Sequence, residues 1–176
     1  MNLLHDIDPG TKDEMNVIVE IPKGSHNKYE VDKETGLIKL DRANYGPAAY
    51  PFDYGFVPQT LWDDGDALDV VLLTTYPLNP GILVVARPIG IMHMVDDGES
   101  DDKIIAVPVD DRRWEHVQKI GDIAPHTLSE IAHFFENGKK LKSKPVEVKV
   151  GETEGREAAE IAFERARKMY EDAKST

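Results

Sequence analysis

The stretch Asp64-Gly65-Asp66-Ala67-Leu68-Asp69-Val70-Val71-Leu72-Leu73 carries three carboxylates within six residues and then enters an apolar run. Neighbouring carboxylates repel one another, and a nearby cation favours their ionised form. The apolar run is typical of a buried strand, so Asp69 is expected where a loop enters the core. Oxygen ligands of this kind suit a hard divalent cation such as Mg²⁺. The stretch therefore predicts a metal site, and an acidic surface turn is the alternative.

An EF-hand calcium loop does not fit this stretch. A loop that started at Asp64 would place Asp69 at its sixth position, where glycine is required. Its twelfth residue would be Thr75, where the EF-hand needs a glutamate.

The composition limits the classes of protein to consider. The 176 residues include 21 basic and 33 acidic side chains, a net charge of −12, and no cysteine. This length fits one domain over residues 1–176, with residues 1–15 as a loose N-terminal arm. The acidic charge argues against a nucleic-acid partner, and the absence of cysteine excludes disulfides and zinc–thiolate sites. No apolar segment suggests a membrane partner or a leader, so a cytoplasmic location is expected.

Upstream of the aspartates, three short stretches alternate polar and apolar residues: 16–21, 28–32 and 37–41. This pattern predicts a β-meander. Side chains two residues apart on a strand point the same way, which makes one polar face from several candidates. These candidates are Glu20, Lys28, Glu30, Lys39 and Arg42. A solvated sheet face is the alternative. The segment 44–58, rich in tyrosine and proline, is predicted to be a functional loop.

Downstream, an arrangement like the first recurs. Residues 82–86 and 89–92 predict two strands broken at Pro88, and a second acidic loop over 96–103 runs into the apolar strand 104–107. Thr127 and Glu130 predict a capping box, and the helix it opens is expected to end at Gly138 in the left-handed conformation. A last strand is predicted over 146–150. An apolar stripe over 156–174 predicts a helix packed on the barrel or sheet.

Kinase-like, ATPase and serine-hydrolase interpretations lose their main support. The phosphate-loop pattern G-x-x-x-x-G-K-[ST] and the nucleophile pattern G-x-S-x-G are both absent from the sequence. The six histidines do not pair at metal-ligand spacing.

The remaining parts suit a strongly anionic small substrate held between metal ions and cationic side chains. From about Val17 to Phe163 the sequence resembles a soluble family I inorganic pyrophosphatase of the prokaryotic type. The resemblance rests on short motifs in the family's order: Glu20-Ile-Pro22, Lys28-Tyr-Glu30, Asp41-Arg42, Tyr50-Pro51 through Tyr54-Gly55, Asp64 to Asp69, Arg87-Pro-Ile-Gly90, Asp101-Asp-Lys103, Ala106-Val-Pro108 and Ile131-Ala-His-Phe-Phe-Glu136.

The resemblance implies a mainly β fold with flanking helices (α+β), namely a five-stranded β-barrel of the oligonucleotide-binding type plus two principal helices. It implies hydrolysis of inorganic pyrophosphate to two phosphates by a metal-activated water. The expected cofactor is Mg²⁺, several ions per active site, with Mn²⁺ as an alternative metal. A homohexamer is the expected assembly.

The resemblance also implies a role for each polar residue. The residues that would hold metal are Glu30, Asp64, Asp69, Asp96 and Asp101, of which Asp64, Asp69 and Asp101 would hold the tightest ion. Phosphate oxygens would be contacted by Lys28, Arg42, Tyr54, Lys103 and Lys139. Glu20 would act through water on a metal. Asp66 would be the general base, and Lys28, Arg42 and Tyr54 would assist it in catalysis.

One departure from the family pattern concerns Gly138, because the family usually places a tyrosine directly before the lysine that follows. A substrate contact is therefore expected to be missing. Two other interpretations stay open at this point. A calcium-binding protein without catalysis would explain the acids, and an oligonucleotide-binding module would explain the barrel.

Overall fold

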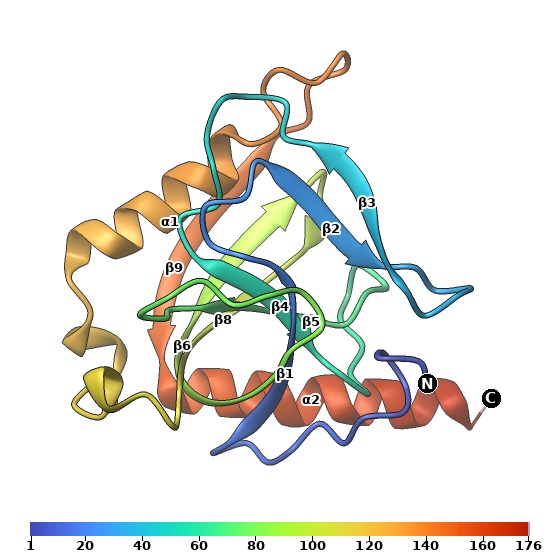
Figure 1. Ribbon diagram of the computed structural model, residues 1–176, viewed down its shortest axis with the longest axis vertical. Helices are drawn as coiled ribbons and strands as arrows, with labels where there is room; N and C mark the ends of the chain where they lie inside the picture. The colour runs from blue at the N-terminus through green and yellow to red at the C-terminus, as the bar shows by residue number, and fades with distance from the viewer. Residues whose placement is uncertain (176) are drawn as a thin grey trace.

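The structure, a computed structural model, describes residues 1–175. Five strands form a closed ring at its centre (Figure 1). They are β1 (Met15–Ile21), β4 (Asp53–Val57), β5 (Leu68–Leu72), β8 (Lys103–Pro108) and β6 (Leu83–Asp96), in that spatial order. The ring closes because β6 pairs with β1. Only the β5–β8 pairing is parallel among these five contacts. This arrangement confirms the predicted five-stranded barrel.

The other elements extend or cover the barrel. Strand β9 (Val148–Gly155) and the short β7 (Glu99–Ser100) pair with β6, whereas β2 (Asn27–Val31) and β3 (Ile38–Ala43) form a separate hairpin. Two 3-10 turns, 112–114 and 120–122, precede helix α1 (Pro125–Asn137), and helix α2 (Arg156–Lys174) ends the described chain. In the view of Figure 1, α2 runs below the barrel and the hairpin stands above it. No helix within residues 1–175 is long and apolar enough to cross a membrane.

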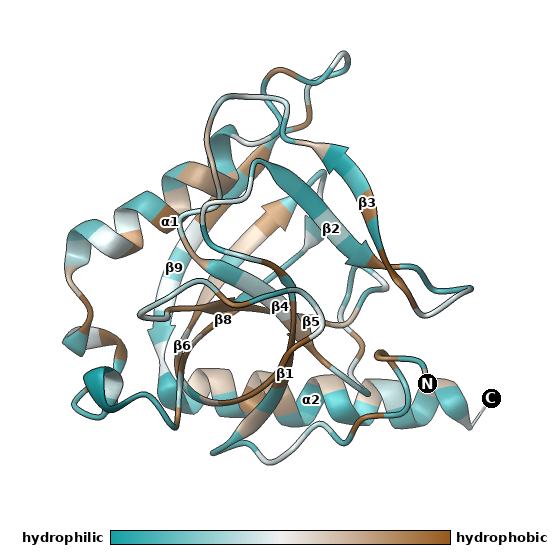
Figure 2. Cartoon of the chain, viewed as in Figure 1, coloured by the Kyte–Doolittle hydropathy of each residue, from teal (hydrophilic) through white to brown (hydrophobic). Residues whose placement is uncertain are grey.

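The predicted meander is wrong in its pairing. Strand β1 pairs with β4 and β6, not with β2. The reason is burial: six of the seven β1 residues are buried, so both of its edges belong to the barrel. The β2–β3 hairpin is mostly hydrophilic, as Figure 2 shows, and it lies outside the closed ring.

The tyrosine-rich segment 44–58 is not a loop throughout, because β4 occupies its second half and is buried at every residue. Gly55 makes this strand possible. A Cβ at Gly55 would lie 2.0 Å from the Ile18 carbonyl oxygen, so β4 and β1 approach more closely than a side chain would permit.

Pro88 does not break the following strand. Strand β6 runs through it for 14 residues, and a register shift against β8 occurs between Pro88 and Gly90. Proline has no N–H to donate to the ladder, and an interruption of the pairing at this point accommodates it. The second acidic loop is also shorter than predicted, since Asp97 and Gly98, both with positive φ, form the two-residue hairpin turn between β6 and β7.

The helix predictions are confirmed in part. Helix α2 spans the predicted residues, and its apolar stripe packs on the barrel core through Ala159, Phe163 and Ala166. Helix α1 begins at Pro125 rather than at the predicted capping box, because proline suits the first turn and no side chain caps Ala124. Gly138 is right-handed, with φ −61°, so the left-handed end predicted there is wrong.

The N-terminal arm and the last strand are also more ordered than the sequence suggested. The N-terminal arm is not loose, because Leu3, Leu4 and Ile7 pack against the buried cluster of Ile18, Val31 and Phe56. Met15 already belongs to β1 and is fully buried. The last strand, β9, starts two residues later than predicted and continues to Gly155.

Candidate active site

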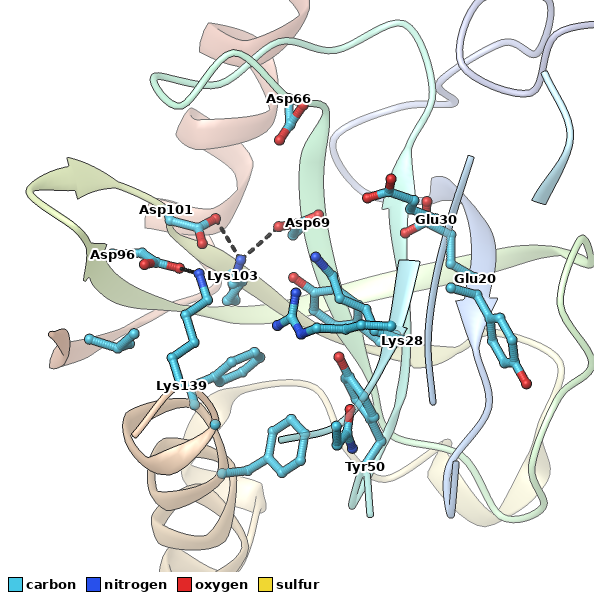
Figure 3. Close-up of a pocket in the computed structure, with 18 of the residues that line it drawn as sticks. Glu20, Lys28, Glu30, Tyr50, Asp66, Asp69, Asp96, Asp101, Lys103 and Lys139 are labelled. Carbon is cyan, nitrogen blue, oxygen red and sulfur yellow. Dashed lines mark hydrogen bonds and ion pairs between the residues drawn. The ribbon is translucent and has the colours of Figure 1, made fainter. Parts of the chain in front are cut away.

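One cavity of about 1010 Å³ collects the predicted site residues (Figure 3). Every one of them lines it: Glu20, Lys28, Glu30, Arg42, Tyr54, Asp64, Asp66, Asp69, Asp96, Asp101, Lys103 and Lys139. They come from the barrel strands, the loops that lead into β5 and β8, the β2–β3 hairpin and the segment after α1. The structure thus brings together all of the residues, while their individual roles stay predictions.

Three carboxylates form the acidic centre of this cavity. Asp64, Asp69 and Asp101 each offer an oxygen, and these three oxygens lie within 4.8 Å of one another. Asp69 belongs to β5, Asp101 lies just before β8, and Asp64 sits on the loop that leads into β5. The parallel pairing of β5 with β8 brings Asp69 close to Asp101.

Lys103 lies between two of these carboxylates (Figure 3). Its Nζ is 2.6 Å from Asp69 Oδ2 and 2.5 Å from Asp101 Oδ1, and its side chain is 3% exposed. Burial opposes the ammonium charge, but the two carboxylates outweigh it and raise the pKa of Lys103. A buried cation is tolerated here because it is paired twice.

The acidic centre is electrostatically strained without a further cation. Burial, with the charges of Asp69 and Asp66, raises the pKa of Asp64. Burial also raises the pKa of Asp101: it outweighs the lowering by Lys103, and the charges of Asp69 and Asp64 add to the rise. An all-oxygen donor set whose members disfavour one another's charge fits a hard divalent cation, which would favour the ionised form of each.

The β2–β3 hairpin supplies the cationic wall. Lys28 and Arg42 face one another in the hairpin register and share the carboxylate of Asp41, at 3.2 and 3.0 Å. Among residues 1–175, the buried Nε of Arg42 has no hydrogen-bond partner. Glu30 lies beside Lys39 at 3.7 Å. Lys28 and Arg42 therefore keep N–H donors that are available to an anionic ligand.

Glu20 is the most deeply buried acid of this wall. Its Oε1 accepts a hydrogen bond from Val31 N at 2.9 Å, which joins β1 to the hairpin. Burial raises the pKa of Glu20 to about 8, and the charge of Asp69 adds to the effect. Without a cation in the cavity, Glu20 is therefore mostly protonated at neutral pH.

The opposite wall is aromatic and ends in a lysine. Phe135 of α1 packs near Tyr54, with ring centroids 6.0 Å apart, and burial keeps the phenol of Tyr54 neutral by raising its pKa. Just after α1, Lys139 forms an ion pair with Asp96, as Figure 3 shows. Gly138 also lines the cavity at this point.

Asp66 is not one of the three clustered carboxylates, and Figure 3 shows it away from Asp69 and Asp101. Its Oδ1 accepts a hydrogen bond from Lys33 Nζ at 2.6 Å, and both side chains are more than half exposed. Sequence reasoning missed Lys33, Asp32 and Asp41, which line the cavity or pair with residues that do. The two-residue alternation from Glu30 to Asp32 was the signal that could have found Asp32.

Comparison with known proteins points in one direction. A family model described as "Inorganic pyrophosphatase" matches residues 17–171. The chain is 51% identical over 146 residues to "Soluble inorganic pyrophosphatase 5" from Arabidopsis thaliana, a match that covers 82% of this chain and 68% of the other.

Solved structures extend the similarity to the whole fold. The inorganic pyrophosphatase from Thermus thermophilus superimposes with a TM-score of 0.93 at 42% identity, covering 97% of this chain and 99% of that one. The enzyme from Helicobacter pylori gives 0.88 at 40% identity, with coverages of 95% and 99%. The similarity thus includes the barrel and both principal helices.

Proposed function

This chain belongs to the inorganic pyrophosphatase family and hydrolyses inorganic pyrophosphate to two phosphates, and we propose that it does so with Mg²⁺ held by the clustered carboxylates. The family is metal-dependent, and the carboxylate oxygens of Asp64, Asp69 and Asp101, within 4.8 Å of one another, are the observation that carries the proposal. Glu30 and Asp96 line the same cavity and would hold further ions. Their oxygen chemistry favours Mg²⁺, and Mn²⁺ is the alternative metal.

The cationic side chains would position the substrate. Lys28 and Arg42 on one wall, with Lys103 and Lys139 on the other, are suited to hold the oxygens of the two phosphoryl groups. The neutral phenol of Tyr54 would add a hydrogen-bond donor. Phosphoryl transfer depends mainly on positioning and charge neutralisation, so no nucleophilic side chain is required.

Lys103 and Lys139 each form ion pairs with carboxylates that we assign to metal: Lys103 with Asp69 and Asp101, and Lys139 with Asp96. If these carboxylates held a divalent cation, each ammonium would have N–H donors available to a phosphate oxygen. The pairs seen in the structure would therefore hold the two lysines at the place where the substrate arrives.

Asp66 would accept the proton from the attacking water. It lines the cavity outside the carboxylate cluster, which leaves its oxygens free of the ligand role assigned to the other three. Bound divalent cations supply a lowered water pKa and neutralise the charge of the phosphoryl group. Glu20, buried and bonded to Val31 N, would orient a water within the site.

One assay tests this assignment. Phosphate release from pyrophosphate should require Mg²⁺, stop when a chelator is added, and return when Mg²⁺ is in excess. Replacing Mg²⁺ by Mn²⁺ or Ca²⁺ separates the candidate metals. A calcium-binding protein without catalysis is unsupported, since it would not explain Lys28, Arg42, Lys103 and Lys139 around the same cavity. Full activity in the presence of chelator would contradict the metal assignment.

Three further features are part of the proposal. Residues 1–176 would form one pyrophosphatase domain, of which the family model spans residues 17–171. A homohexamer is the proposed assembly, and light scattering at pH 8 that gave the mass of a monomer would contradict it. A cytoplasmic location is proposed as well, in agreement with the word "soluble" in the name of the Arabidopsis relative.

A further inference from the structure

The loop that carries Asp64 is fastened to α2, a helix distant from it in the sequence. Arg165 of α2 donates two hydrogen bonds to the carboxylate of Asp63, from Nη2 to Oδ1 at 2.6 Å and from Nη1 to Oδ2 at 3.2 Å. The same guanidinium lies over the Trp62 ring, with Cζ 4.5 Å from the ring centroid. A planar group bound along its edge and stacked on its face has little orientational freedom. Arg165 therefore fixes both residues that precede Asp64.

Trp62 and Leu61 strengthen this attachment. Trp62 is 5% exposed and belongs to the same core cluster as Ala162 and Ala166 of α2. The backbone N–H of Leu61 donates to the Ala166 carbonyl oxygen at 3.0 Å. Three consecutive residues, Leu61 to Asp63, are thus held by one helix.

The turn that follows is internally rigid. Trp62 N donates to Asp66 O at 2.7 Å, and Gly65 N donates to Trp62 O at 3.0 Å. Asp66 N donates to Asp64 Oδ1 at 3.0 Å. Gly65, at φ +85°, adopts the left-handed conformation that the turn needs. The orientation of Trp62 is therefore transmitted to the Asp64 carboxylate through these bonds.

The other two clustered carboxylates do not depend on this loop. Asp69 is part of β5, and the backbone N–H of Asp101 donates to Met94 O of β6 at 2.9 Å. The barrel holds both of them. Asp64 is the one whose distance from its two partners is decided by the loop and its attachment.

We propose that Arg165 is a positioning residue for the metal site, which acts through Asp63 and Trp62 to hold Asp64 beside Asp69 and Asp101. The inference rests on the proposed role of Asp64 as a metal ligand. Arg165 itself is absent from the residues that line the cavity within the described chain, so it does not act by touching substrate.

Metal affinity, rather than stability, is expected to depend on Arg165. The Arg165 and Asp63 side chains are 47% and 35% exposed, and exposed ion pairs contribute little to folding. Groups that orient metal ligands, in contrast, commonly change metal affinity by about 10–100-fold. Because Arg165 acts one residue away from the ligand, we expect Arg165→Ala to weaken Mg²⁺ binding by about tenfold, at the low end of that range.

The measurement is calorimetric titration of Mg²⁺ alone into the full chain after removal of metal by a chelator. Arg167→Ala is the matched control. Arg167 lies on the same helix, pairs with Glu171 at 3.5 Å and lies over the Phe163 ring at 5.8 Å, and within residues 1–175 no hydrogen bond or ion pair joins it to the loop. Removing either arginine makes the protein more negative, which by itself would tighten Mg²⁺ binding. A weakening confined to Arg165→Ala therefore reports position and not charge.

Two more variants separate geometry from charge. Arg165→Lys keeps the charge but loses the two-pronged bond, so it should weaken Mg²⁺ binding as well. Asp63→Asn removes the other side of the pair, and the double variant should be no worse than Arg165→Ala alone. If Arg165→Ala fails to fold, Arg165→Lys, which leaves the net charge unchanged, is the variant that decides.

The outcomes distinguish this inference from the function on which it rests. Asp64→Asn serves as the reference. If Asp64→Asn weakens Mg²⁺ binding while Arg165→Ala binds like Arg167→Ala and Arg165→Lys binds like the unmodified chain, the positioning role is overturned and the metal assignment stands. If Asp64→Asn binds Mg²⁺ like the unmodified chain, the metal assignment of Asp64 and the positioning role of Arg165 are both overturned. Tenfold weaker binding in Arg165→Ala, with a melting temperature equal to that of Arg167→Ala, is the expected result.

Discussion

Asp69 and Lys103 stand opposite one another in the parallel register of β5 and β8, and Lys103 Nζ donates to Asp69 Oδ2 at 2.6 Å. The two residues are 34 positions apart in the sequence. Since Asp101 accepts from the same ammonium at 2.5 Å, one buried lysine pairs with two of the three clustered carboxylates. Lys103 therefore supplies this site with a counter-charge from the protein itself.

Lys103→Met tests this arrangement. The metal-free variant should melt below the unmodified chain, because breaking a buried ion pair costs up to about 3–5 kcal/mol and these carboxylates are partly buried. Added Mg²⁺ should then raise the melting temperature more than it does in the unmodified chain, since it becomes the main counter-charge. Lys168→Met, which removes an exposed pair with Asp172 on α2, should change neither value. Equal Mg²⁺ shifts in all three proteins would contradict the argument.

Asp66→Asn tests the general base. Asparagine keeps the size of the side chain but cannot accept the proton, so kcat should fall by about 10²–10⁴. Mg²⁺ binding by calorimetry and thermal unfolding should hardly change, because Asp66 lies outside the carboxylate cluster and its bond to Lys33 is exposed. Asp69→Asn is the contrast: it should weaken Mg²⁺ binding, and excess Mg²⁺ should restore part of its activity. Near-normal kcat in Asp66→Asn would remove Asp66 from this role.

Glu20 predicts a pH dependence of stability in the metal-free protein. Burial raises its pKa from 4.5 to about 8, so between these values the folded state binds more protons than the unfolded state. The free energy of unfolding should therefore fall as pH rises from about 4.5 to 8. Glu20→Gln, which resembles the protonated form, should flatten this slope and be the more stable protein at pH 8. Denaturant unfolding in chelator, measured from pH 5 to 8, checks it; parallel slopes in the two proteins would count against it.

Gly138→Tyr tests the missing contact. Gly138 is right-handed, so a side chain meets no backbone strain there, although its Cβ would lie 3.3 Å from Phe134 O and require a small adjustment. A phenol that reaches a charged phosphate oxygen contributes about 1.5–3 kcal/mol, so KM should fall about tenfold or more. The melting temperature should not fall by much, since glycine is a poor residue at a helical position.

Gly138→Phe is the matched control for that variant, because it adds the same ring without the hydroxyl. If both variants lower KM equally, the gain comes from packing on the aromatic wall and not from a hydrogen bond. If neither lowers it, the cavity does not use a contact at position 138.

The sequence alone determined the features that depend on near neighbours in the chain. The 3.6-residue apolar period of residues 156–174 predicted α2 with its observed bounds, because amphipathic spacing is a property of one helix. The acids before the apolar run at Val70 likewise predicted a carboxylate cluster at a strand entrance, where Asp69 is found.

Tertiary structure alone decided what depends on distant pairing. Strand β4 lay hidden in a tyrosine-rich segment, since its five buried residues are explained by the barrel strands on both sides of it. Gly138 is right-handed although its sequence context favours a left-handed helix end. The contact of Lys103 with Asp69 and the bond from Arg165 to Asp63 join residues 34 and 102 positions apart. No local pattern encodes such contacts, because they arise only when the closed ring fixes which strands and helices are neighbours.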